Sequence, residues 1–137
     1  MRMIVDTNVI LSALIKEGTT RAILTNPLIE FYTIEFAIKE IRKYKSLVIE
    51  KSGLSDEEFE IMLSLVMSNV KVVEKRQIEE KINESKELIE KVDPKDVPIL
   101  ACALTIPNDG LWSEDKHLKK QSKIKIFTTR EILAEIK

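Results

Sequence analysis

A short apolar, β-prone run near the start of the chain ends directly in an acid. Residues 3–5 are Met-Ile-Val, the next residue is Asp6, and a helix-like apolar pattern begins at once within residues 9–14. We interpret the run as a buried strand that delivers a carboxylate at its C-terminal end. Ligands of open parallel sheets bind just beyond the carboxyl ends of the strands. Asp6 is therefore the predicted anchor of an acidic site.

The rest of the chain continues this alternation of β-prone runs and helical patterns. Further strands are expected at residues 29–33, 69–73, 111–113 and 123–127. Helices are expected at residues 8–16, 20–25, 34–51, 78–92 and 97–104, with a small helix opening at Asp115. Strands that alternate with helices predict an α/β fold, in which helices cover both faces of a parallel sheet.

Local signals set the ends of several helices. Ser55 and Glu58 form a capping box that opens one more helix with a long apolar stripe. Gly53 is expected to end the helix before it, and either Thr128 or Thr129 to cap the last helix of the chain.

Length and composition restrict the class of protein. The 137 residues are expected to form a single domain, 1–137. The composition, with 44% hydrophobic and 33% charged residues, is typical of a soluble globular protein. There is no apolar run that could span a bilayer and no signal-peptide pattern, so the expected location is cytoplasmic. The single cysteine, Cys102, is expected in the core. The net charge of −1 does not by itself indicate nucleic-acid binding.

Asp96 and Asp115 occupy settings similar to that of Asp6. Asp115 lies just beyond the strand expected at 111–113, and Asp96 lies at the start of a buried helix. Each acid taken alone fits a helix N-cap. If the strands before Asp6 and Asp115 are neighbours, however, their acids meet at one edge of the sheet. Like charges at close range are unfavourable unless a cation lies between them, and hard oxygen ligands suit Mg²⁺ or Mn²⁺ rather than zinc.

A further acid is expected from the helix at residues 34–51, where Glu35 and Glu40 are both candidates. Five positions apart on a helix, they point about 140° away from each other. Only one of them is therefore expected to face the site. Both flank the apolar stripe, so periodicity alone does not choose between them.

Several motifs follow one another across almost the whole chain. They are Asp6-Thr7-Asn8, a helical glutamate within residues 37–41, Asp96-x-x-Ile99-Leu100-x-x-Ala103, and Leu-Trp-Ser-Glu-Asp-Lys-His-Leu at residues 111–118. In this order they resemble the PIN domain family. The resemblance implies a three-layer α/β/α sandwich with a central, mostly parallel five-stranded sheet. It also implies metal-dependent ribonuclease activity and, often, homodimers.

The resemblance assigns roles residue by residue. The acids are Asp6, Glu40, Asp96 and Asp115, and the polar residues that accompany the first and last of them are Asn8 and Ser113. Asp93 falls where some family members carry an additional acid, but we interpret it as a loop residue before a proline. Glu114 replaces the small residue often found before the last acid. It is either an exposed loop glutamate or one that alters metal access, and we leave it outside the predicted site.

The predicted reaction is hydrolysis of phosphodiester bonds in RNA by an endoribonuclease that uses Mg²⁺ or Mn²⁺. Divalent ions can activate a water molecule and shield charge on the phosphate and on the leaving oxygen. The aspartates would be metal ligands, and Glu40 would bind metal directly or through water. The accompanying polar residues would orient carboxylates, water or phosphate by hydrogen bonds.

Basic residues flank the predicted acids and are expected to rim the site, although most of them also fit a solubilising role. They are Lys39, Arg42, Lys43, Lys45, Lys95, Lys116, Lys119 and Lys120. His117 is interpreted as a surface histidine rather than a general base. Trp112 is interpreted as a core residue rather than a platform for base stacking.

Other functions are weighed against the ribonuclease. A stand-alone PIN domain of this size often serves as the toxin of a toxin–antitoxin pair, so an antitoxin partner is a further expectation by analogy. The main alternative is a non-catalytic PIN-like module that binds RNA or protein. A phosphoacceptor receiver or an aspartyl phosphatase also places an acid after its first strand. An aspartyl phosphatase needs a second acid two residues after the first, and this chain has Asn8 there. A receiver needs a lysine after its last strand, and this chain has Thr128-Thr129-Arg130 there. These residues argue against both classes.

Overall fold

A parallel sheet forms the centre of the computed structural model, which describes residues 1–136. Its strands are β1 (Arg2–Val5), β2 (Glu30–Ile34), β3 (Val70–Val73), β4 (Gly110–Trp112) and β5 (Ile126–Phe127). The sheet has five strands in the order β3-β2-β1-β4-β5, and every neighbouring pair is parallel. The expected α/β class and strands are confirmed, although β5 is shorter than residues 123–127. β1 lies at the centre of the sheet, between β2 and β4.

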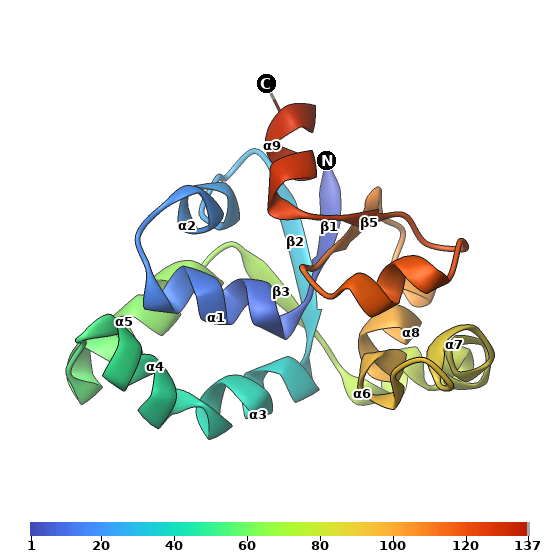
Figure 1. Cartoon of the computed structure of the whole chain (residues 1–137), viewed down its shortest axis with the longest axis horizontal. Helices are drawn as coiled ribbons and strands as arrows, with labels where there is room; N and C mark the ends of the chain where they lie inside the picture. The colour runs from blue at the N-terminus through green and yellow to red at the C-terminus, as the bar shows by residue number, and fades with distance from the viewer. Residues whose placement is uncertain (137) are drawn as a thin grey trace.

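Helices enclose the sheet. The α-helices are α1 (Thr7–Ile15), α2 (Thr19–Leu24), α3 (Glu35–Lys43), α4 (Lys45–Ser52), α5 (Asp56–Met67), α6 (Lys75–Ile78), α7 (Ile82–Ile89), α8 (Val97–Thr105) and α9 (Thr129–Glu135). Short 3₁₀ helices are η1 (Glu79–Lys81), η2 (Pro94–Asp96) and η3 (Lys116–Lys120). Figure 1 shows α1, α2, α4 and α5 on one side of the sheet and α6, α7 and α8 on the other. The described part of the chain contains no helix long and apolar enough to cross a membrane.

Alternating side chains of β1 belong to two separate cores, as the period of a strand requires. Met3 and Val5 pack with α1, α2 and α5, whereas Ile4 packs with α8 and its neighbours. All three side chains have no exposed surface. A strand that is apolar on both faces is what a three-layer fold needs at its centre.

Trp112 is buried in the first of these cores, as expected from the sequence. Its exposed fraction is 0%, and its ring lies 5.7 Å from that of Phe31, measured between centroids. The indole Nε1 donates a hydrogen bond to the hydroxyl of Thr129 at 3.0 Å, which satisfies its one polar group. Cys102 is also buried, as expected.

The structure corrects two of the expected helices. The single helix expected at residues 34–51 is broken at Tyr44, whose φ of −94° and ψ of 11° lie outside the helical region. The break lets α4 pack against α1 and α5. The helix expected at residues 78–92 is likewise divided, into α6, η1 and α7. Apolar periodicity continues across both breaks, so it did not reveal them.

The expected caps are present. Ser55 accepts a hydrogen bond from the N–H of Glu58, which in turn accepts one from the N–H of Ser55, so the capping box is complete. Gly53 ends α4 with a positive φ of 77°, a conformation that favours glycine. Of the two threonines proposed for the last helix, Thr128 is the cap.

Candidate metal centre

Asp6 is held rigidly at the carboxyl edge of the sheet. Its backbone N–H donates to the carbonyl of Trp112 on β4, at 3.0 Å, so the two strands that precede Asp6 and Ser113 are in register. One carboxylate oxygen of Asp6 accepts from the N–H of Thr7 at 2.8 Å, and the other from the hydroxyl of Ser113 at 2.7 Å. β1 and β4 are thus neighbours, as the predicted convergence of the acids requires.

The predicted acids line one cavity, of about 170 Å³. Its lining residues are Asp6, Thr7, Asn8, Leu11, Glu40, Tyr44, Asp93, Lys95, Asp96 and Asp115. Glu40 reaches it from α3, and its carboxylate accepts a hydrogen bond from the hydroxyl of Thr7 at 3.0 Å. Glu35 instead accepts from the N–H of Lys75 at 2.8 Å, at the start of α6. Of the two glutamates left open by the sequence, Glu40 is therefore the one at the cavity.

Asn8 and Ser113 join the first and last acids. The amide of Asn8 donates to the Asp6 carboxylate at 3.4 Å and to the Ser113 hydroxyl at 3.3 Å. The same hydroxyl accepts from the N–H of Asp115 at 3.0 Å. Ser113 itself is buried. Both polar residues thus fix the orientation of the carboxylates, which is how groups around a metal site hold its ligands.

Glu114 points elsewhere. Its carboxylate accepts a hydrogen bond from the N–H of Thr129, at 2.6 Å, beside the start of α9. It is not among the residues that line the cavity. Its side chain therefore binds the first backbone N–H of α9 and not the cavity.

Negative charge at the cavity is poorly compensated. Asp96 is only 6% exposed, and its Oδ2 has no hydrogen-bond partner. Burial, together with the carboxyl of Asp115 and the charges of Asp6 and Asp93, raises the pKa of Asp96 to about 8. Burial also raises the pKa of Asp6, although hydrogen bonds from Ser113 and Thr7 partly oppose it. Without a cation, the cavity therefore retains a proton at neutral pH.

Asp115 behaves in the opposite way. Burial alone would raise the pKa of its carboxyl, but hydrogen bonds from the carboxyl of Asp96 and from His117 hold that pKa below its ordinary value. Asp96 and Asp115 thus act as a pair in which one carboxyl is protonated and the other is ionised. A divalent ion among these oxygens would replace the shared proton. The residues present therefore fit a hard divalent cation.

Two residues that we placed outside the predicted site lie beside Asp115. The Nδ1 atom of His117 is 2.9 Å from Oδ1 of Asp115 and 3.7 Å from Oδ2 of Asp93. The His117 side chain is 58% exposed, so it is at the surface as expected, but it also contacts the acids. Asp93 caps η2 by accepting from the N–H of Lys95 and lines the cavity as well. The spacing of Asp93 three positions before Asp96 was the available signal, because residues three apart share a face of a 3₁₀ turn.

A comparison with protein families identifies the family to which this fold belongs. A family model described as PIN domain matches residues 4–137. The chain belongs to the PIN domain family. PIN domains are typically metal-dependent nucleases, and the acidic cavity lies where this fold brings the ends of β1 and β4 together. A comparison with curated proteins gives no significant match.

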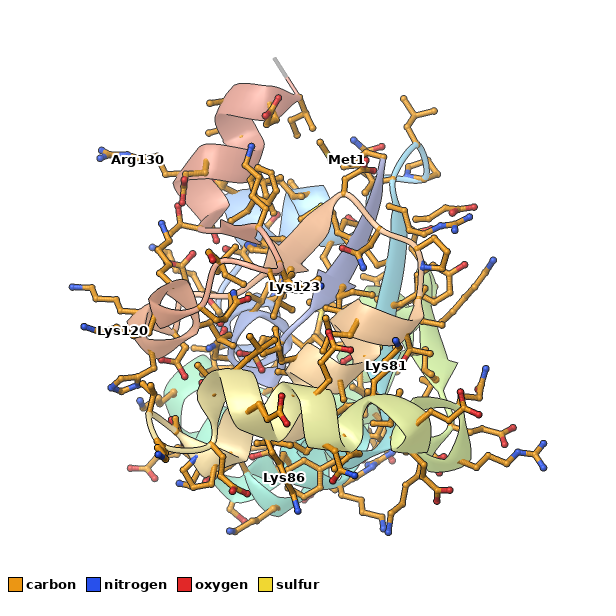
Figure 2. The ribbon with its side chains drawn as sticks, turned by 90° about the vertical axis from the view of Figure 1, so that its right-hand side faces the viewer. Met1, Lys81, Lys86, Lys120, Lys123 and Arg130 are labelled. Carbon is orange, nitrogen blue, oxygen red and sulfur yellow. The ribbon has the colours of Figure 1, made fainter. Side chains whose placement is uncertain are left out.

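Lysines line two further cavities next to the acids of this PIN domain. One, of about 330 Å³, contains Lys39, Lys43 and Lys95 and shares Glu40, Tyr44 and Lys95 with the acidic cavity. The other, of about 490 Å³, contains Lys116, Lys119 and Lys120 and shares Asp115. Figure 2 shows Lys120 projecting away from the ribbon.

Arg42, Lys45 and Lys119 are engaged with neighbouring helices. Arg42 and Lys45 form ion pairs with Glu60 of α5, at 2.6 Å and 2.9 Å. Lys119 forms one with Glu131 of α9, at 2.8 Å.

Proposed function

We propose that this PIN domain is a metal-dependent endoribonuclease that hydrolyses phosphodiester bonds in RNA with Mg²⁺ or Mn²⁺. The observation that supports it most is the carboxylate set. Asp6, Glu40, Asp96 and Asp115 come from separate elements and line one cavity. One oxygen in this set, Oδ2 of Asp96, is buried without a partner. Buried polar atoms normally have partners, and a divalent ion beside Asp96 and Asp115 would supply one in place of the proton that the two carboxyls share.

Each residue has a distinct part in the proposed reaction. Asp6, Asp96 and Asp115 would hold the divalent ion, and Glu40 would do so directly or through water. The ion would activate a water molecule for attack on phosphorus and shield charge on the phosphate and leaving oxygen. Asn8 would keep its amide directed at Asp6, leaving the carboxylate geometry fixed as substrate enters. The hydroxyl of Ser113 would hold Asp6 and the backbone of Asp115 together.

The lysine-lined cavities are the proposed path of the RNA. An acidic cavity repels a phosphate chain, whereas Lys39 and Lys43 on one side and Lys120 on the other would attract it. Tyr44, which is 36% exposed, lines both the acidic cavity and the adjoining lysine-lined one. The Nζ atom of Lys43 lies over this ring, 5.6 Å from its centroid, and the ring would stack on a base of single-stranded RNA while Lys43 contacts the phosphate.

The wider biological setting is proposed by family analogy. We propose a cytoplasmic toxin, a single PIN domain over residues 1–137 that forms a homodimer and is inhibited by an antitoxin protein. A pull-down from the native host that recovers no inhibitory partner would argue against the toxin role. It would leave the nuclease proposal untouched, because cleavage depends on the cavity alone.

The nuclease proposal is tested by removing one ligand at a time. We expect Asp6→Asn and Asp115→Asn to abolish Mg²⁺- or Mn²⁺-dependent cleavage of RNA while the circular dichroism spectrum stays unchanged. Asp56→Asn is the matched control, because that carboxylate is 85% exposed at the start of α5. Full cleavage by the two site variants, or by the native protein in excess chelator, would refute the proposal. RNA binding without cleavage in the native protein would favour the non-catalytic module.

A further inference from the structure

We propose that an apolar pocket beside α3 binds one unstacked base of single-stranded RNA and so restricts the substrate to unpaired RNA. The pocket has a volume of about 230 Å³ and lies outside the acidic cavity. It rests on the proposed function for the identity of its ligand, and it adds a contact that recognises a base rather than a phosphate.

Apolar side chains from separate elements form this base pocket. They are Ile34 at the end of β2, Phe36 on α3, Ile78 on α6, Ile82 on α7 and Pro98 on α8. Ile34 and Ile78 are buried, whereas Phe36 is 49% exposed. The hydrogen bond from the N–H of Lys75 to the Glu35 carboxylate, at 2.8 Å, joins the start of α3 to α6, which lie side by side in Figure 1. The pocket is therefore enclosed by elements that are held together.

The size and the aromatic wall of the base pocket suit a nucleobase. Cavities that hold drug-sized ligands usually measure about 300–1,000 Å³, so this smaller pocket suits a small, flat group. An unpaired base of RNA is flat, and both of its faces stack on aromatic side chains. Phe36, with half of its surface exposed at the pocket, supplies such a side chain.

The charges around the base pocket favour RNA over an apolar side chain of a protein partner. Lys39 and Lys75 also line the pocket, and their ammonium groups would attract the phosphates that flank a bound base. The acid in the lining, Glu35, is engaged with the N–H of Lys75. An aromatic ring beside lysines is the combination by which proteins bind single-stranded nucleic acid.

The base pocket is continuous with the proposed catalytic site. It shares Phe36, Lys39 and Pro98 with the lysine-lined cavity of about 330 Å³, and that cavity shares Glu40 with the acidic one. Phe36 and Glu40 are four residues apart on α3, which is about 6 Å along the helix axis. A base in the pocket would therefore belong to a nucleotide close to the phosphate that is cleaved.

This position of the base pocket predicts a preference for unpaired RNA. The bases of a duplex are paired and stacked, and taking one out of the stack is unfavourable, whereas a single strand offers its bases freely. The lysines alone would not make this distinction, because both kinds of RNA carry phosphates.

The test is fluorescence anisotropy with the full chain in excess chelator, so that metal-dependent cleavage does not interfere. The probes are a labelled single-stranded RNA of mixed sequence and the same strand annealed to its complement. We expect the native protein to bind the single strand more tightly. Phe36→Ala should weaken binding of the single strand about fivefold or more and leave binding of the duplex unchanged. The salt dependence should also be unchanged, because no charge is removed.

Matched variants show whether the ring itself is required. Leu65→Ala, on α5, is the control, because Leu65 is 51% exposed and lies outside the described lining of the pocket. Phe36→Tyr keeps an aromatic ring and should bind the single strand as the native protein does, whereas Phe36→Leu should lose most of the preference. A Phe36→Leu variant that retains the full preference would overturn stacking on this ring.

The outcomes separate the base pocket from the proposed function. Equal binding of both probes by the native protein, or undiminished binding of the single strand by Phe36→Ala, overturns the pocket even where Mn²⁺-dependent cleavage is intact. A change in subunit number in Phe36→Ala, measured by light scattering, would identify the pocket as a protein contact and also overturn it. Loss of single-strand binding in Phe36→Ala, with a native protein that cleaves no RNA in Mn²⁺, supports the pocket and overturns the nuclease.

Discussion

Replacing Asp96 by asparagine tests the electrostatics of the cavity without any RNA. The Asp96 carboxyl is 6% exposed, and burial beside Asp115 raises its pKa from 3.8 to about 8. Each tenfold change in proton affinity corresponds to about 1.4 kcal/mol. The folded protein therefore resists ionisation of this carboxyl by on the order of 5 kcal/mol.

The sign of the effect on stability follows from where the proton is held. Between the ordinary pKa of 3.8 and the raised value of about 8, the folded protein keeps a proton on Asp96 that the unfolded chain has lost. The free energy of unfolding then falls as the pH rises, by about 1.4 kcal/mol per pH unit from this group. Its contribution is fully present below pH 4 and is lost as the pH approaches 8.

Asp96→Asn removes this titration and keeps the shape of the side chain. In chelator, we expect the variant to unfold with the same free energy as the native protein near pH 4. At pH 8 we expect it to be more stable, by up to on the order of 5 kcal/mol. Saturating Mn²⁺ should stabilise the native protein and leave the variant nearly unchanged.

The assay is urea-induced unfolding across this pH range, with and without Mn²⁺. Asp56→Asn, whose carboxylate is exposed, should show a pH dependence parallel to that of the native protein. A variant of Asp96 that is no more stable than the native protein at pH 8 in chelator would refute the electrostatic reasoning. So would a stability difference that is the same at pH 4 and pH 8.

Two further predictions concern the RNA path and the packing of the sheet. Replacing both Lys39 and Lys43 by alanine should weaken RNA binding and make the binding affinity less sensitive to salt. The measurement is fluorescence anisotropy of labelled RNA between about 50 and roughly 200 mM salt. An unchanged salt dependence would contradict the proposed path. Gly110→Ala should destabilise the fold by about 1–3 kcal/mol in urea unfolding, because the added Cβ would lie 2.4 Å from the ring of Phe127. A variant as stable as the native protein would show that this ring moves freely.

The arrangement of the sheet could be predicted because it rests on short, strong patterns. The apolar run before Asp6 and the run before Ser113 are buried on both faces, as parallel strands are. The breaks within the helices could not be predicted in the same way. Tyr44 interrupts α3 and α4 without interrupting the apolar stripe, because Ile41 and Val48 still reach the same core. A periodic pattern records which face is buried and not where the helix axis bends.

The acids could be proposed from their places in the chain, but their contacts could not. Strand ends fixed the expected positions of Asp6 and Asp115, whereas the choice between Glu35 and Glu40 depended on how α3 meets the sheet. The contact of His117 with Asp93 joins two turns that are far apart in sequence, and local periodicity says nothing of such a contact. For Asp93, the sequence alone favours a loop residue before a proline.

The measurement that tests the central claim most directly is anomalous diffraction from a crystal of the native protein soaked in Mn²⁺. The account predicts an anomalous peak within bonding distance of carboxylate oxygens of Asp6, Asp96 and Asp115. A fully soaked crystal with no peak at these oxygens, or with its only peak elsewhere on the molecule, would contradict it.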